Sequence, residues 1–274
     1  MLRNVPGLSA QFAEINVAYS KILIIISPPR SGSTALSRVF WEQPSIRYYA
    51  HEPFEIVFYE QRPVKEVLAK LKQPIDLGPL KRNPGPETEK GLVIKEMPYQ
   101  VGDYFAHLVS LTHKPVTFLI RDPRQSISSR MRKKIEVGQS PVFPNIETGW
   151  TLLAAQIEHC RKYTIPFTIV DSGEFRRYPE TIFKRLFSRL GLPFFPGMLK
   201  WKALPNFDLD NLDGHHTHLY QTVLGSKGVT KDSDPIPGLE YFPEKNGFRR
   251  HVLDCLEIYH RLRELPELIR MPAG

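Results

Sequence analysis

The sequence predicts an α/β fold, a single domain with a central parallel sheet flanked by helices. Short segments that are continuously apolar and rich in β-branched residues recur along the chain, as is typical of strands buried on both faces of a parallel sheet. Segments with apolar residues at helical spacing alternate with these strands, which indicates repeated strand–helix units. With 274 residues, 41% hydrophobic and 24% charged, the chain suits one large globular domain.

The first strand and its loop organise the rest of the chain. Five apolar residues in a row, four of them isoleucine, predict a strand over 22–27 that ends at Pro28. An apolar stripe after the loop predicts a helix over 33–43. In such a unit the loop N–H groups and the positive end of the helix face one point, so a P-loop-like phosphate site is expected.

The other elements follow in order. Strands are predicted over residues 46–50, 91–95, 115–120 and 166–171, and helices over 63–72, 99–111, 147–163, 179–190, from Pro123 onward and around 248–259. Residues 1–19 are expected to be a lead-in. Residues 73–91 carry four prolines and three glycines without periodicity, which predicts a loop. One domain is expected to span 1–274, with 196–274 forming a loop-rich closing region and a last helix.

Composition narrows the environment and the partners. No apolar run approaches the roughly 18–20 residues that cross a membrane, so no membrane association is expected. The first twenty residues lack the apolar core of a signal peptide, and two cysteines make no disulfide framework, which favours a cytoplasmic location. The net charge of +8 favours an anionic partner, either nucleic acid or a polyanionic small molecule.

The loop differs from the phosphate loop of kinases and NTPases, G-x-x-x-x-G-K-[ST]. In that register Ser27 replaces the first Gly and Ser33 replaces the Lys, while the cation lies three residues earlier, at Arg30. A P-loop kinase or NTPase would therefore lack its phosphate-bridging Lys, and it remains the alternative function. An ordinary turn between a strand and a helix is the structural alternative.

A second candidate anion site begins where the strand over 115–120 ends. Arg121 follows that strand, and the ligands of open α/β sheets gather at the carboxyl ends of strands. Ser129 lies eight positions later, off the apolar row that includes Ile127 and Met131, so it need not face the core. A guanidinium and a hydroxyl together can clamp a phosphate. The alternative is an Arg121 that is salt-bridged to a carboxylate such as Asp122.

The loop Pro29-Arg30-Ser31-Gly32-Ser33-Thr34 resembles the 5′-phosphosulfate loop of sulfotransferases that use 3′-phosphoadenosine-5′-phosphosulfate (PAPS). The spacing of Arg121 and Ser129 resembles the site for the 3′-phosphate in that family, and residues 167–195 are similar to a third family segment. That segment differs from the family pattern at Asp171 and Ser172, where the family has an acidic pair. The resemblance covers about residues 21–195. The C-terminal R-K-G-x-x-G-D-W-K motif is absent, and Ser226-Lys227-Gly228 is at most a fragment of it, from which Lys227 and Gly228 are assigned to the cofactor.

The resemblance implies in-line transfer of a sulfuryl group from PAPS to a hydroxyl or amine of a small acceptor, without a metal. The residues Pro29, Arg30, Ser31, Gly32, Ser33 and Thr34 would hold the 5′-phosphate. Within that loop, Arg30 would meet the bridging oxygen. Lys95 would meet the sulfuryl oxygens, and Arg121 with Ser129 would hold the 3′-phosphate.

The resemblance offers two places for the catalytic base. Some members carry a His directly after the Lys of the third strand, but here Glu96 and Met97 follow Lys95. Others carry a Glu at the end of the second strand, where this chain has Glu52 with His51 beside it. We predict Glu52 as the base, with His51 and then Glu96 as alternatives. The structural alternative is that His51 and Glu52 belong to a turn and that their side chains cap the next helix.

The acceptor is expected to contact the segments of least resemblance, 54–91, 140–150 and 205–246. Their carboxylates, Glu147, Asp208, Asp210 and Asp213, favour a polar or cationic small molecule. His215, His216 and His218 are weak candidates for a metal site, and no metal is predicted. The basic run 130–134 is interpreted as a face that attracts the cofactor, and no nucleic acid partner and no particular oligomeric state are predicted.

Overall fold

The computed structural model describes residues 7–209, 220–231 and 235–272. In this part of the chain a six-stranded sheet has the order β3-β2-β4-β1-β5-β6. The strands are β1 (Lys21–Ile26), β2 (Ile46–His51), β3 (Ile75–Asp76), β4 (Gly91–Glu96), β5 (Val116–Ile120) and β6 (Phe167–Asp171). β3 pairs antiparallel with β2, and the other neighbours are parallel. The predicted α/β class and central sheet are confirmed.

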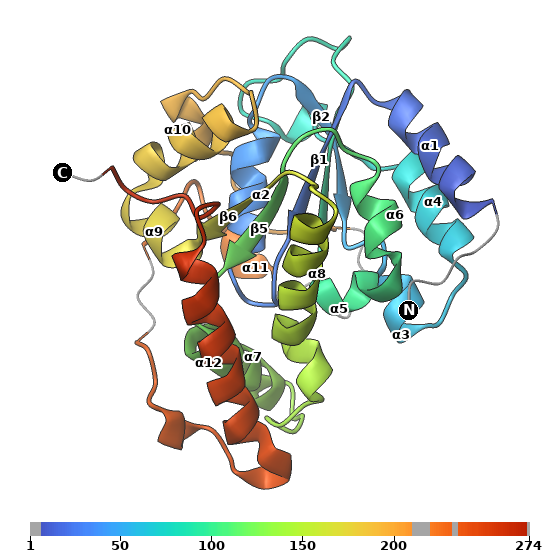
Figure 1. Cartoon of the computed structure of the whole chain (residues 1–274). Helices are drawn as coiled ribbons and strands as arrows, with labels where there is room; N and C mark the ends of the chain where they lie inside the picture. The colour runs from blue at the N-terminus through green and yellow to red at the C-terminus, as the bar shows by residue number, and fades with distance from the viewer. Residues whose placement is uncertain (1–6, 210–219, 232–234, 273–274) are drawn as a thin grey trace.

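Helices cover both faces of the sheet (Figure 1). One layer contains α1 (Leu8–Ala18), α4 (Val64–Lys72), α6 (Phe105–Val109), α8 (Trp150–Lys162) and α12 (Phe248–Glu264), and the other contains α2 (Ser33–Trp41), α9 (Ser172–Arg177) and α10 (Pro179–Arg189). In β1, Ile22 and Ile24 join the first core while Leu23 and Ile25 join the second. This alternation explains the unbroken apolar run, because both faces of the strand are buried.

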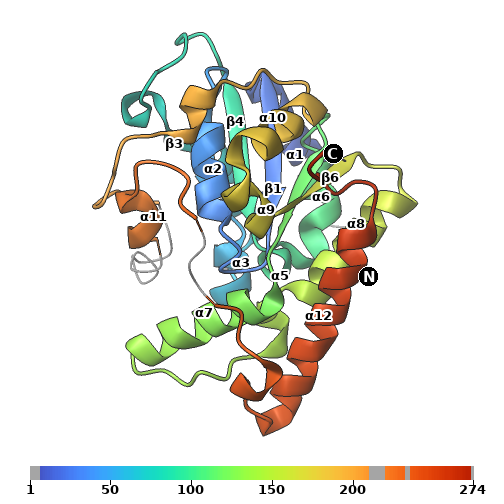
Figure 2. The same cartoon turned by 90° about the vertical axis from the view of Figure 1, so that its left-hand side faces the viewer.

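Shorter elements surround the carboxyl ends of the strands (Figure 2). They are α3 (Glu55–Tyr59), α5 (Pro98–Val101), α11 (Gln221–Gly225) and the longer α7 (Pro123–Glu136). The described chain also has 3₁₀ turns at Gly78–Leu80, Gly102–Tyr104, Asn145–Thr148, Pro196–Leu199, Leu239–Tyr241 and Lys245–Gly247, of which the first lies at the amino end of β2. α7 leaves the end of β5 and packs against α12 beyond the sheet. Since β1 lies between β4 and β5, the loop after β1 opens where the chain connections diverge, the usual place for a ligand in such sheets.

Three sequence-based expectations are corrected. The lead-in over 1–19 contains α1, whose buried Leu8, Phe12 and Ile15 at spacing i, i+4 and i+7 pack on the first core. The loop over 73–91 contains the short edge strand β3. The helix over 99–111 is interrupted at Gly102, where a φ of 47° breaks α5 from α6.

The C-terminal part of the described chain returns to the edge of the sheet. The Tyr259 hydroxyl on α12 donates to Oδ2 of Asp171 at 2.8 Å, and Ile169 in β6 bridges to Leu268. These contacts join the last helix to the core that residues 21–171 build. No helix among the described residues has both the length and the apolarity that a membrane crossing requires.

Candidate active site

A cavity of about 830 Å³ opens at the carboxyl ends of β1, β2, β4 and β5. The structure brings together in its lining ten of the residues predicted from the sequence: Pro29, Arg30, Gly32, Ser33, Thr34, Glu52, Lys95, Arg121, Ser129 and Gly228. They come from the loop after β1, the ends of β2 and β4, the start of α7 and the segment 220–231. Segments that are far apart in the sequence therefore share one site.

Four predicted site residues do not line this cavity. The side chain of Ser31 is fully buried, and that of Lys227 is exposed elsewhere. His51 is buried behind Glu52, with Nδ1 at 2.6 Å from the Tyr49 hydroxyl. Glu96 is buried and accepts from the backbone N–H of Phe54 at 2.7 Å, and burial raises the pKa of its carboxyl well above the usual value. Their placement leaves Glu52 as the base candidate whose side chain reaches the cavity.

The loop after β1 presents backbone at the start of α2. Gly32, with a φ of 88°, is the N-cap of α2, so no side chain at this position caps the first N–H groups of the helix. The φ of Gly32 favours glycine, and a Cβ there would also lie tightly against side-chain atoms, 3.0 Å from Nη2 of Arg176 and 3.1 Å from Oγ of Ser172. Ser33 and Thr34 begin the helix and line the cavity, at the point where the sequence predicts a backbone anion site.

Two arginines connect this loop to the start of α7. Nη1 of Arg121 donates to the carbonyl oxygen of Arg30 at 3.1 Å, and Nε of Arg30 donates to Oγ of Ser129 at 3.3 Å. Burial lowers the pKa of the Arg30 guanidinium from its usual value, with Arg121 as a cationic neighbour, but a guanidinium stays protonated in proteins. The residues predicted to hold the 5′- and 3′-phosphates thus lie within hydrogen-bonding distance of each other.

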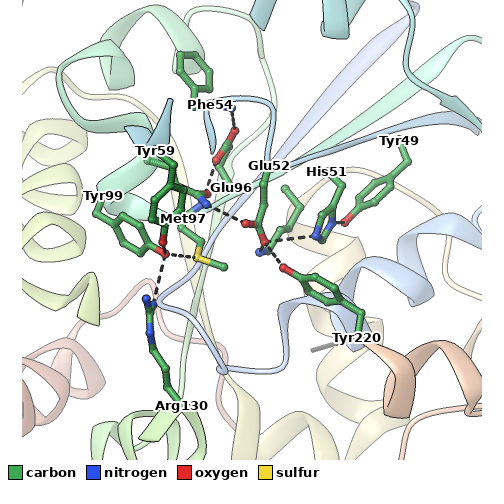
Figure 3. A network of polar contacts seen from close by, with 12 residues as sticks. Tyr49, His51, Glu52, Phe54, Tyr59, Glu96, Met97, Tyr99, Arg130 and Tyr220 are labelled. Carbon is green, nitrogen blue, oxygen red and sulfur yellow. Dashed lines mark hydrogen bonds and ion pairs between the residues drawn. The ribbon is translucent and has the colours of Figure 1, made fainter. Parts of the chain in front are cut away.

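Glu52 is the centre of a buried polar network (Figure 3). It follows β2 with a left-handed φ of 49°, and its side chain is only 1% exposed. Oε1 forms an ion pair with Nζ of Lys95, accepts from the Tyr220 hydroxyl at 3.0 Å and lies 3.3 Å from Nε2 of His51. Oε2 accepts from Nε2 of Gln100 at 2.9 Å. The side chain is therefore fixed from several directions.

The surroundings of Glu52 decide its protonation. Burial alone would raise the pKa of the carboxyl, but the Lys95 ammonium, His51 and the hydrogen bonds outweigh burial and lower the pKa to about 2. Glu52 is therefore a carboxylate at neutral pH. The ion pair with Lys95 also weakens it as a proton acceptor.

Aromatic residues form the opposite wall of the cavity. The hydroxyls of Tyr59 and Tyr99 lie 3.2 Å apart, and Tyr99 also donates to Sδ of Met97 at 3.1 Å (Figure 3). Arg130 donates to the Tyr99 hydroxyl at 3.4 Å and forms a partly buried ion pair with Glu147. Glu147, expected from the sequence to face an acceptor, instead neutralises Arg130.

The cavity is strongly cationic. Nine lining residues are Lys or Arg and three are Glu, namely Arg30, Lys95, Arg121, Arg130, Arg132, Lys133, Lys134, Arg176 and Lys231 against Glu52, Glu55 and Glu136. Sequence reasoning did not identify Arg176 or Gln100, because no local motif marks them, and it placed Tyr220 only within a segment expected to contact the acceptor. Asp208 is exposed away from the cavity, and Asp210, Asp213, His215, His216 and His218 lie outside the described residues. Among the described residues no cluster suited to a metal ion is found.

Comparison with known proteins identifies the fold. No protein-family model and no curated protein matches the sequence. Among solved structures, the sulfotransferase domain from the curacin biosynthetic pathway is 17% identical with a TM-score of 0.51, covering 90% of this chain and 99% of that domain. The sulfotransferase domain of the Synechococcus PCC 7002 olefin synthase is 14% identical with a TM-score of 0.50, covering 88% and 95%. The chain therefore has the sulfotransferase fold.

Proposed function

We propose that this protein is a PAPS-dependent sulfotransferase that transfers a sulfuryl group to a hydroxyl or amine of a small acceptor. One observation carries the proposal. In a chain with the sulfotransferase fold, a single cavity has the anion-binding start of α2 with Arg30 and Arg121 on one side, and the Glu52–Lys95 pair on another. Leaving-group stabilisation and proton transfer need these two sets of groups.

The residues present suit a donor with several negative charges. The start of α2 offers backbone N–H groups to an anion, and Gly32, Ser33 and Thr34 there line the cavity. Arg121 and Ser129 would hold a second phosphate a short distance away, and the excess of cations over carboxylates in the lining balances the charge of such a ligand. The kinase or NTPase alternative is not favoured, because Ser33 occupies the position of the phosphate-bridging Lys.

When bound, PAPS supplies a sulfuryl group whose bond to the bridging phosphate oxygen breaks as the acceptor oxygen or nitrogen bonds to sulfur. Arg30 would meet the negative charge that develops on the bridging oxygen. Lys95 would meet the sulfuryl oxygens, which draws its ammonium away from Glu52. Losing this cationic neighbour raises the pKa of Glu52 and makes it a stronger base for the acceptor proton.

The acceptor is proposed to occupy the part of the cavity beside Tyr59, Tyr99 and Glu52. This wall offers tyrosine hydroxyls together with aromatic surface, which suits a small molecule with polar groups on an apolar frame.

Both cysteines of the chain are free and buried, in keeping with the proposed cytoplasmic location.

Two measurements test the function. Adenosine 3′,5′-bisphosphate (PAP), the product of the donor, should bind in calorimetry and should not be displaced by ATP. Wild-type protein with [³⁵S]PAPS should then transfer label to members of a panel of hydroxyl and amine acceptors. Tight ATP binding with hydrolysis, and no affinity for PAP, would contradict the proposal.

A further inference from the structure

Tyr220 is a buried phenol that reaches the proposed base from a distant part of the chain. It lies directly before α11 and 168 positions after Glu52, and only 7% of it is exposed. Its hydroxyl donates to Oε1 of Glu52 at 3.0 Å, and its ring meets the ring of His51 edge-on, with centroids 4.8 Å apart (Figure 3). Both Tyr220 and Glu52 line the cavity.

The contacts of the Glu52 carboxylate are unequal on its two oxygens. Oε1 meets Lys95, Tyr220 and His51, whereas Oε2 accepts from Gln100. A carboxylate oxygen has two lone pairs, so the groups around Oε1 use its full capacity. Oε2 retains capacity for one more donor, such as the hydroxyl of an acceptor.

We propose that Tyr220 is a positioning residue that anchors Glu52 through Oε1, so that Oε2 is the atom that takes the acceptor proton. The inference rests on the proposed function. In the step, the proton passes from the acceptor to Oε2, the acceptor atom bonds to sulfur, and the bridging S–O bond breaks with its electron pair on the departing phosphate of PAP. The proton on Glu52 then returns to solvent.

The need for Tyr220 follows from the two roles of Lys95. When Lys95 turns to the sulfuryl oxygens, Glu52 loses its strongest restraint at the moment of proton transfer. The neutral donors Tyr220 and Gln100 do not compete for those oxygens as a cation does, and they keep the carboxylate in place. Burial, with Glu52 and Glu55 as anionic neighbours, raises the pKa of the Tyr220 phenol well above its usual value, so it stays protonated and donates.

The test compares two buried tyrosines that each donate to a carboxylate. Tyr220→Phe removes one oxygen atom and keeps the ring on His51, and Tyr259→Phe removes the donor to Asp171 at 2.8 Å, outside the cavity. All variants are compared at a temperature where urea unfolding shows each to be folded. We expect Tyr220→Phe to lower kcat by about ten- to a hundredfold, as for loss of a hydrogen bond to a charged group, with the Kd for PAP unchanged. Tyr259→Phe should lower the free energy of unfolding and leave kcat as in the wild type.

A double-mutant cycle separates positioning from a purely structural role. On the Glu52→Gln background, Tyr220→Phe should cause no further loss of kcat, because the group on which it acts is already gone. The loss should also shrink with more acidic acceptors, and Tyr220→His, which keeps a ring and an N–H donor, should recover part of the rate. A wild-type kcat in Tyr220→Phe would overturn this inference but not the proposed function. The same holds if the loss of kcat from Tyr220→Phe adds to the loss from Glu52→Gln. A wild-type protein that transfers no label would overturn the proposed function, and this inference with it.

Discussion

Arg121 donates a hydrogen bond from its guanidinium to the backbone carbonyl of Arg30, at 3.1 Å, across the edge of the sheet. The contact joins the end of β5 to the loop after β1, which are the two segments assigned to the phosphates of the donor. Arg30 holds a left-handed φ of 60°, a conformation that non-glycine residues adopt only when their surroundings impose it. Arg121 thus helps to hold the conformation of the loop, in addition to its proposed contact with the donor.

Arg121→Ala should weaken PAP binding by about ten- to a hundredfold, the loss expected for a charge-assisted hydrogen bond. Binding of adenosine 5′-phosphate, which lacks the 3′-phosphate, should weaken much less. Calorimetry with both ligands measures the difference, and Arg124→Ala is the matched control, since Arg124 pairs with Asp122 outside the cavity. Equal losses for both ligands would remove Arg121 from the 3′-phosphate site.

Arg30→Ala should lower kcat more than it lowers donor affinity. Backbone N–H groups at the start of α2 supply most of the binding to the 5′-phosphate, whereas the guanidinium meets charge that develops as the bridging bond breaks. Steady-state kinetics with PAPS as the varied substrate separates the two effects. Arg30→Lys, which keeps a cation, should retain part of the rate. A variant with normal kcat and a raised KM for PAPS would disprove this role.

Glu52→Gln should lower kcat by about a hundred- to ten-thousandfold while PAP binding stays intact, because the amide keeps the size of the side chain but takes no proton. An acidic acceptor such as a nitrophenol should recover part of the rate. Glu42→Gln is the control, because Glu42 is also a buried carboxylate, bonded to the backbone N–H of Arg82 at 3.0 Å and distant from the cavity lining. If Glu52→Gln is nearly silent and His51→Ala is inactive, the role of base passes to His51.

The free energy of unfolding at acid pH should reveal the buried ion pair between Glu52 and Lys95. The pKa of Glu52 is lowered to about 2, so its contribution to folding is complete above the ordinary glutamate pKa of about 4.3 and is lost as the pH falls toward about 2. The difference in the free energy of unfolding between wild type and Glu52→Gln should therefore narrow from about pH 6 to about pH 3. Urea unfolding at each pH measures it.

The control for this titration is an exposed ion pair. Glu14 and Lys72 lie 3.0 Å apart with both side chains more than half exposed, and such pairs contribute little to folding. Glu14→Gln should show a small difference from wild type at every pH. A difference for Glu52→Gln that stays constant over the same range would contradict the lowered pKa.

The strands and the phosphate loop could be predicted from the sequence because their signals are local. The run of isoleucines in β1, the loop around Gly32 and the spacing of Arg121 and Ser129 each lie within a few residues of one another. The apolar spacing of α1 was equally local and could have been identified. By contrast, Gln100 and Tyr220 reach Glu52 only because the fold brings α5 and the segment before α11 to the end of β2.

The direction of the Glu52 side chain also could not be predicted from a local sequence pattern. His51 continues the alternation of β2 with Tyr49, to which its ring is bonded, so it points into the packed side of the sheet. The next residue departs from strand geometry, with a φ of 49°, and its side chain turns to the cavity. A positive φ in a glutamate has no sequence signal, so the order of preference between His51 and Glu52 depended on the resemblance.

Ser129 and Arg130 are neighbours on α7 that serve opposite sides of the cavity. Ser129 contacts Arg30 in the phosphate loop, and Arg130 contacts Tyr99 in the wall proposed for the acceptor. We therefore expect a shift of this one helix to change both sides together, which would couple the binding free energies of the proposed donor and acceptor. By reciprocity, whatever factor the donor imposes on the affinity for the acceptor, the acceptor imposes on the affinity for the donor.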